Sequence, residues 1–252
     1  MSESTRSVER ALDILLCFNG KTPTRTLAQI TERVGLPKST VHRLLTTLEA
    51  KRFVHRNGAD GSYRLGVQLI ELGASVRWDT GIADLATPHL ERLSAECRET
   101  VDLAIFDGSE VVYLKVIESS QRMKIAAAPG ERLPAFCTAT GKVFLAFMPE
   151  DQVREILKKN RRKYTDHTQL SFTALSQSLQ ATRSRGYALS LGEYEDGISA
   201  VAAPILDTNQ HPIAAIAVVG PTFRLPKERI MLIGKSVKIT ADRIAQEIVS
   251  AG

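Results

Sequence analysis

The sequence of 252 residues has few cysteines and no long apolar run. Its three cysteines, Cys17, Cys97 and Cys137, are far apart and form no CxxC pair, which argues against a disulfide framework and a structural zinc site. Such sparse use of cysteine fits a reducing cytoplasm. No apolar run approaches the roughly 18 residues that a membrane-spanning helix needs. No segment near the start has the pattern of a secretion signal, so we expect a chain that is not inserted in a membrane.

Motifs that mark several classes of enzyme are also missing. The sequence contains no nucleophile elbow, no phosphate-binding P-loop and no HExxH pair. Its five histidines are scattered, and the carboxylates of the segment GEYEDG have no histidine-rich partner at the spacing of metal ligands. We therefore predict no catalytic residue, no metal ion and no cofactor.

Positive charge is present, and it is unevenly distributed. The formal net charge is +5. Residues 1–66 contain 11 Lys and Arg against 6 Asp and Glu, whereas residues 67–252 contain 22 of each sign, so the first quarter carries the whole excess. A basic segment beside a neutral remainder indicates a nucleic-acid or membrane-surface partner for that segment. The length allows one large domain or two smaller ones.

Two short helices are expected within this basic segment. The first begins with Ser7 as its N-cap and ends before Asn19. Its apolar face has the spacing i, i+3, i+4, i+7 and comprises Val8, Ala11, Leu12 and Leu15. The segment TPTRT then favours a turn-rich break. Thr26 and Gln29 have the spacing of a capping box, so they predict a second helix over residues 27–34, which Gly35 ends.

The segment GLPKSTVHRLLTTLEA predicts a third helix that starts at Pro37. One side is apolar and comprises Val41, Leu44, Leu45 and Leu48. The opposite and flanking positions hold small polar and basic residues, namely Ser39, Thr40, His42, Arg43, Thr46 and Thr47, and Lys38 lies in the first turn. The major groove of B-DNA admits one helix, where Arg bonds guanine in two places and a Thr methyl contacts thymine. We expect these seven residues to contact DNA, and Arg25, Arg56 and Arg64 to contact phosphates around the groove.

A hairpin is expected after this helix. Residues 53–56 and 62–65 alternate as strands around the turn NGADG. The order helix, helix, tight turn, helix, hairpin is that of a winged helix-turn-helix over residues 1–66. A small three-helix domain without a DNA partner would satisfy the same caps and turns, but it explains neither the acid-free side nor the charge. Residues 67–80 have a helical pattern, which we interpret as a semi-rigid linker helix.

Residues 81–252 combine strands and helices in a second domain. The expected strands cover residues 101–106, 111–117, 122–128, 187–191, 200–206 and 213–219, and the expected helices begin near Leu85, Thr138, Pro149, Ala174 and Pro226. Strand hairpins followed by flanking helices favour a mainly antiparallel sheet with helices packed on it, which is an α+β fold.

Several long stretches match one known family in the correct order. Near the start these are SVERALDILLCF, LAQITERVGLPKSTVHRLLTTLEAKRFV and YRLG, and near the end GYALSLGEYEDGISAVAAPI and AAIAVVGP. On these stretches the chain resembles the IclR-type bacterial transcription regulators over nearly its whole length. The resemblance implies a winged helix-turn-helix joined to an effector domain of GAF-like fold. It also implies homodimers, often dimers of dimers, on palindromic operators. We expect a repressor whose DNA affinity a small-molecule effector modulates.

The same resemblance places an effector site in the second domain. Backbone N–H groups of the family's pocket match Ala139 and Thr140, ahead of Gly141. Four positions that are polar in members sensing small carboxylates are occupied here by Ser190, Ala200, Ala217 and Val219. Because a pocket with fewer hydrogen-bonding groups binds a small, highly charged ligand poorly, we expect a larger or more apolar effector, such as an aromatic acid. The alternatives are that these positions line ordinary core and the ligand lies elsewhere, or that there is no ligand.

One enzyme hypothesis stays open beside the regulator. Some GAF-like domains reduce small oxidised substrates with cysteines, so this chain could be a cysteine-dependent reductase or redox sensor fused to a DNA-binding domain. That chemistry requires Cys97 and Cys137 to approach each other, and at least one of them to have a lowered pKa.

Overall fold

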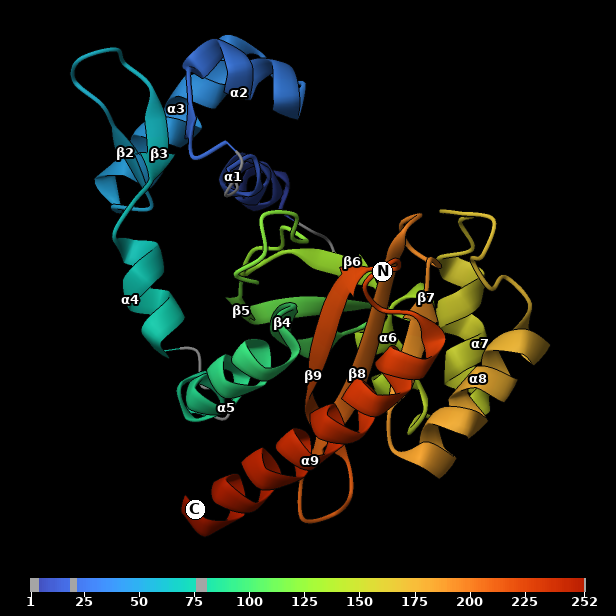
Figure 1. Cartoon of the computed structure of the whole chain (residues 1–252). Coiled ribbons are helices and arrows are strands. Elements are labelled where there is room, and N and C mark those ends of the chain that lie inside the picture. Colours follow the sequence, from blue (N-terminus) through green and yellow to red (C-terminus); the bar gives the residue numbers. More distant parts are fainter. Residues whose placement is uncertain (1–4, 19–21, 76–80, 252) are drawn as a thin grey trace. The chain divides into compact units, whose positions relative to one another are not determined.

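The computed structural model describes residues 5–18, 22–75 and 81–251. The chain divides into two compact units, Met1–Thr80 and Gly81–Gly252 (Figure 1). The predicted linker segment 67–80 begins with helix α4, Gln68–Ser75, and its residues 76–80 lie outside the described residues. A linker separate from the first unit therefore stays a prediction.

The N-terminal unit has the predicted order of elements. These are α1 (Arg6–Leu16), β1 (Thr24–Arg25), α2 (Leu27–Val34), α3 (Lys38–Ala50), β2 (Val54–Arg56), β3 (Tyr63–Leu65) and α4. The three short strands form one antiparallel sheet in the order β1-β3-β2. Three helices followed by a β2–β3 wing confirm the winged helix-turn-helix.

Local sequence explains how α2 and α3 are set against each other. The Thr26 hydroxyl accepts a hydrogen bond from the Gln29 N–H (3.3 Å), and the Gln29 side chain accepts one from the Thr26 N–H (2.8 Å), which closes the predicted capping box. Gly35 ends α2 with φ of 65°, a left-handed conformation that glycine adopts without strain. The core beneath the helices comprises Ile14, Cys17, Phe18, Ile30, Val41, Leu45, Val54 and Tyr63.

Three details of this unit differ from the prediction. Helix α1 is capped by Thr5 rather than Ser7, a shift of the size at which helix ends commonly vary. The segment TPTRT contributes strand β1, because Thr24 and Arg25 pair with β3 in a ladder that only the folded unit supplies. The buried side of α1 is centred on Ile14, whereas Val8 and Leu12 of the predicted core face are exposed.

The C-terminal unit is a six-stranded antiparallel sheet with helices on both faces (Figure 1). Its strands are β4 (Thr100–Asp107), β5 (Glu110–Ile117), β6 (Arg132–Pro134), β7 (Ala188–Leu191), β8 (Ile198–Leu206) and β9 (Pro212–Pro221), in the order β6-β5-β4-β9-β8-β7. Its helices are α5 (Ile82–Cys97), the short η1 (Ala135–Cys137), α6 (Ala139–Leu145), α7 (Glu150–Lys159), α8 (Phe172–Arg185) and α9 (Lys227–Ala251). The predicted α+β architecture is therefore confirmed.

Alternation along the strands divides this unit into two layers of core. Large residues such as Val101, Leu103 and Ile216 lie on the face covered by α5 and α9. The opposite face, toward α6, is rich in alanine and includes Ala104, Ala188, Ala202, Ala215 and Ala217. Helices α7 and α8 pack beyond α6. Small side chains on the α6 face leave room above the sheet, and this position matters for the site described below.

One predicted strand is wrong, and one strand was not predicted. Residues 122–128 form no ladder, while β6 lies at residues 132–134, where no strand was expected. The carbonyl of Ile125 accepts a hydrogen bond from the Thr100 hydroxyl (3.1 Å), so a side chain holds the segment over the sheet in place of a neighbouring strand. Strand β6 pairs with only three residues of β5, which is too short a stretch for a local sequence signal.

Candidate functional site

Helix α3 presents the predicted polar side to solvent. Val41 and Leu45 are fully buried and Leu44 and Leu48 are half-buried, so the apolar side packs inward as expected. Of the seven predicted contact residues, Thr40 is half-buried, and Lys38, Ser39, His42, Arg43, Thr46 and Thr47 are exposed. No acidic residue occurs between Lys38 and Leu48. This side of α3 therefore has the shape and charge to lie in the major groove.

Two threonines of this side are oriented by the helix itself. The Thr46 hydroxyl donates to the His42 carbonyl (3.0 Å), and the Thr47 hydroxyl donates to the Arg43 carbonyl (3.1 Å). Because each hydroxyl proton is used within the helix, the outward chemistry of these side chains is a methyl group and an acceptor oxygen. A methyl group is what contacts thymine in the major groove.

The three flanking arginines have different environments. Arg56 on β2 and Arg64 on β3 are exposed, and Arg56 lies 5.9 Å from the centre of the Tyr63 ring. Arg25 is half-buried: its Nε–H donates to the Cys17 carbonyl (2.7 Å), and an Nη donates to the Thr22 hydroxyl (3.2 Å). Arg25 thus ties β1 to the end of α1. These bonds hold the Arg25 side chain in place, and its contact with a phosphate stays a prediction.

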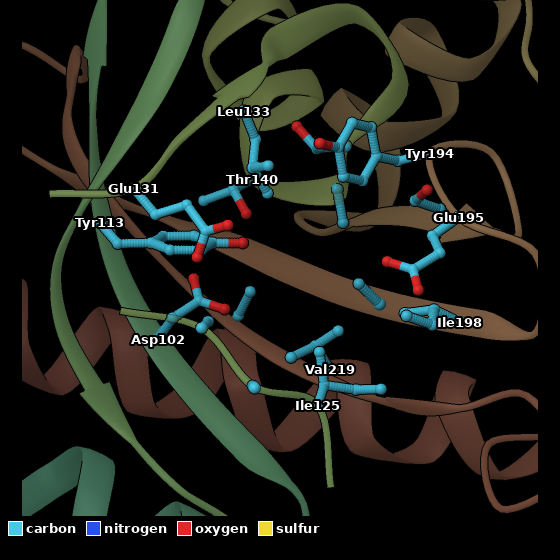
Figure 2. A pocket seen from close by; sticks show the side chains of 17 residues that line it. Asp102, Tyr113, Ile125, Glu131, Leu133, Thr140, Tyr194, Glu195, Ile198 and Val219 are labelled. Atoms are coloured by element: carbon cyan, nitrogen blue, oxygen red, sulfur yellow. The ribbon is translucent and has the colours of Figure 1, made fainter. Parts of the chain in front are cut away.

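The C-terminal unit contains a cavity of about 100 Å³ between the sheet and the start of α6 (Figure 2). Its floor is formed by neighbouring strand positions that face α6. Asp102 pairs with Ala217, and in the adjacent row Val219 pairs with Ala200, which pairs with Ser190. Ile125, Ala126 and Ala127 of the unladdered segment line it further, together with Leu133 and the Tyr194–Glu195 turn.

Six of the seven predicted effector residues line this cavity: Ala139, Thr140, Ser190, Ala200, Ala217 and Val219. The Ser190 hydroxyl donates to the Cys137 carbonyl (3.0 Å), so only its acceptor capacity is left for a ligand. Gly141 does not line the cavity. A Cβ on Gly141 would lie 2.2 Å from the Ala135 carbonyl oxygen, so this glycine allows α6 to pack closely on η1.

Sequence reasoning missed the cavity's acidic and aromatic side chains. Asp102, Tyr113, Glu131, Tyr194 and Glu195 all line it (Figure 2). Asp102 is 1% exposed, and its Oδ1 atom has no hydrogen-bond partner among the described residues. Burial raises the pKa of Asp102 to about 8, and burial together with the Asp102 charge raises the pKa of Tyr113. The available signal was an acid inside the apolar strand VDLAIF.

Two basic residues that are next in sequence to lining residues, Lys124 and Arg132, are paired with acids. None of the lining residues drawn in Figure 2 is Lys, Arg or His. Arg132 pairs with Asp107 (2.6 Å) and Glu110 (2.8 Å), and Lys124 pairs with Glu118. The cavity lining therefore contains three carboxyl groups and no cationic side chain.

Lys142 and Glu193 form a buried ion pair behind the cavity. The Lys142 Nζ lies 2.5 Å and 2.6 Å from the two Glu193 oxygens and donates to the Leu189 carbonyl (3.2 Å). Burial lowers the pKa of Lys142 and raises the pKa of Glu193, while their mutual attraction opposes both changes. The pair joins α6 to the turn after β7, so it fixes two walls of the cavity.

The cysteines are not arranged for redox chemistry. Cys97 packs in the core layer of α5 and α9, whereas Cys137 packs with α7 and α8 on the other side of the sheet. Burial raises the pKa of Cys97, and burial raises the pKa of Cys137 to about 12. Both thiols therefore stay protonated, and Cys137 does not have the lowered pKa that the reductase hypothesis requires.

Comparison with known families decides what this pair of units is. The family model for the bacterial transcriptional regulator IclR C-terminal domain matches residues 75–246, and the IclR helix-turn-helix domain matches residues 7–58. The chain belongs to the IclR family of bacterial transcription regulators. It is a DNA-binding regulator with an effector domain, and not an enzyme.

Relatives within the IclR family span the whole architecture. The HTH-type transcriptional regulator XynR of Escherichia coli is 37% identical over 87% of this chain and 88% of its own. The transcriptional repressor IclR of the same organism is 32% identical, over 92% and 86%. An IclR homologue from Microbacterium hydrocarbonoxydans, solved in complex with 4-hydroxybenzoate, is 26% identical and has a TM-score of 0.87 over 97% of this chain and 99% of its own.

In the part of this regulator that the structure describes, every helix is too short or too polar to span a bilayer. Among residues 5–18, 22–75 and 81–251, no group of three or more His, Cys, Asp or Glu side chains has the arrangement of a metal site.

Proposed function

We propose that this chain is a ligand-responsive repressor that binds a palindromic operator as a homodimer or a dimer of dimers. The observation that supports this most is the exposed, acid-free side of α3, with Arg43 at its middle and Val41 and Leu45 anchoring it from behind. Lys38, Ser39, Thr40, His42, Thr46 and Thr47 would share the groove with Arg43, and Arg56 and Arg64 of the wing would contact phosphates. Repression is supported by the names of relatives such as the transcriptional repressor IclR.

Assembly from two copies is supported by an apolar stripe on α1. Val8, Leu12 and Leu16 are four residues apart, so they lie on one side of the helix, and they are 56%, 53% and 80% exposed in the single chain. A second copy would cover this stripe. It would also place a second α3 on the symmetric half-site, about 34–36 Å away or a multiple of that distance.

The effector is proposed to bind in the cavity beside α6. Ala139, Thr140, Ser190, Ala200, Ala217 and Val219 line it, and its volume of about 100 Å³ suits a compact molecule with a single ring or short chain. The relative bound to 4-hydroxybenzoate supports an aromatic body. We therefore propose an effector with an apolar, ring-containing body. The acid part of the expected effector stays untested: the relative's ligand is an aromatic acid, whereas the lining here includes Asp102, Glu131 and Glu195 and no basic side chain.

The experiment that tests the DNA proposal is titration of a fluorescent promoter fragment, taken from upstream of the protein's own gene, against a scrambled fragment. We expect Arg43→Ala to reduce affinity for the promoter at least tenfold, because a bidentate guanine contact contributes about 1–3 kcal/mol. Arg243→Ala removes an exposed arginine of α9 and is the matched control. Circular dichroism should match for all three proteins. An Arg43→Ala protein that still distinguishes promoter from scrambled DNA as well as wild type does would refute the proposal.

A further inference from the structure

Asp102 faces no polar side chain across the ladder of its own sheet. Its two neighbours across the ladder are Val116 on β5 and Ala217 on β9, and neither side chain has a polar atom. Its Oδ1 atom is fully buried without a hydrogen bond from the described residues, and Asp102 lines the cavity. A buried carboxyl without a donor is unfavourable by about 1–3 kcal/mol or more. What would satisfy it is an N–H or O–H group placed inside the cavity.

The charges around Asp102 select the sign of that group. Glu131, held by the Ala128 N–H (3.2 Å), and Glu195, exposed at the turn after Glu193, line the same cavity. Carboxyls without a lining cation repel an anion and attract a cation. The rings of Tyr113 and Tyr194 add to this preference, since the faces of aromatic rings attract cations. A bare metal ion is disfavoured, because the acids among the described residues do not converge as metal ligands do.

We propose that the cavity binds a compact organic amine in its ammonium form, with the ammonium N–H groups donating to Asp102 and the apolar body resting on Ala200, Ala217 and Val219. This inference rests on the proposed function, in which the cavity is the effector site. Glu195 lies at the opposite end of the cavity from Asp102 in Figure 2, where it adds attraction for an entering cation. The alanines supply the room that a ring needs.

The test compares three ligands of similar shape and different charge on the full-length protein. Benzylamine is a cation at neutral pH, benzyl alcohol is neutral and benzoate is an anion; 4-hydroxybenzoate is added because a relative binds it. Calorimetry should detect benzylamine, with benzyl alcohol at least about tenfold weaker because it lacks the charge-assisted hydrogen bond, and neither acid should bind. Asp102→Asn should weaken benzylamine about tenfold or more. Asp84→Asn, an exposed acid on α5, should leave the affinity unchanged.

Several results would overturn this inference. They are tighter binding of benzoate or 4-hydroxybenzoate than of benzylamine, benzylamine affinity that Asp102→Asn does not change, and no binding of any of the ligands. The comparison of ligands on wild-type protein needs no variant, so it holds even if Asp102→Asn folds poorly. If an aromatic acid binds and causes release of promoter DNA, the amine proposal is wrong and the proposed regulatory function stands. If benzylamine binds but the protein has no affinity for its promoter, the proposed regulatory function is wrong and the amine proposal stands.

Discussion

Asp102 makes the stability of the C-terminal unit depend on pH. Its pKa is raised by burial from 3.8 to about 8, so between these values the folded chain holds a proton that the unfolded chain has lost. Stability therefore falls as pH rises through this window, and the full penalty is present above it. The groups that line the cavity with Asp102, namely Tyr113 and Glu131 from neighbouring elements and Tyr194 and Glu195 from the turn, add no positive charge to relieve it.

We expect Asp102→Asn to remove this penalty. The free energy of unfolding of the variant should match wild type near pH 4 and exceed it by a few kcal/mol near pH 9, because asparagine stays neutral throughout. Urea denaturation at pH 4.5, 7 and 9 measures the difference. Asp196→Asn, which changes an exposed acid, is the control and should show no such trend. A constant difference between Asp102→Asn and wild type at all three pH values would contradict the raised pKa.

Some residues of the two candidate sites could be predicted from the sequence, and others could not. The seven residues of α3 follow from helical geometry alone, since the apolar residues define the buried side and hence its opposite. Arg25 could not be placed, because its partners Cys17 and Thr22 are brought near only by β1. Asp102 was missed for a similar reason: its position in the cavity depends on which strands lie beside β4.

At the scale of elements, α6 is joined to the turn after β7 by the buried Lys142–Glu193 pair. Lys142→Met should lower the free energy of unfolding by about 3–5 kcal/mol, because it leaves the Glu193 carboxyl buried without a cation. The double variant Lys142→Met/Glu193→Leu should recover much of this loss. Arg132→Met breaks a half-exposed pair of similar composition and should change stability by about 1 kcal/mol or less. If urea denaturation shows the same loss of unfolding free energy for Lys142→Met and Arg132→Met, the buried pair contributes no more to stability than the half-exposed one.

Elements with strong local signals were predictable, and those that depend on a distant partner were not. The capping box of α2, the Gly35 turn and the paired strands β4 and β5 all follow from residues within one short segment. Strands β1 and β6 have two and three residues, and each exists because another strand lies beside it. Residues 122–128 are apolar enough for a strand, but Thr100 holds the carbonyl of Ile125 and the segment covers a cavity instead.

At the scale of the whole molecule, the exposed stripe on α1 predicts how copies associate. Leu12→Glu with Leu16→Glu should shift sedimentation from dimer or larger species toward monomer, because charged side chains do not pack in an apolar interface. Promoter affinity at nanomolar protein should fall with it, since two half-sites are no longer bound together. Leu232→Glu, at a 63% exposed leucine of α9, is the control. If only Leu232→Glu dissociates the protein, the contact between copies lies in the C-terminal unit.

The alanine-rich face of the six-stranded sheet has a consequence for how such a sensor can change over time. Ala200 and Ala217 sit in ladders whose strength comes from main-chain bonds, so no bond is lost when either side chain grows or shrinks. Exchange of either alanine for glycine, valine or threonine would alter the shape of the cavity that the proposed effector enters. The DNA-binding unit would keep its sequence. If the cavity is the effector site, as proposed, ligand specificity can change, or be engineered for a biosensor, by substitutions that leave the DNA-binding unit unaltered.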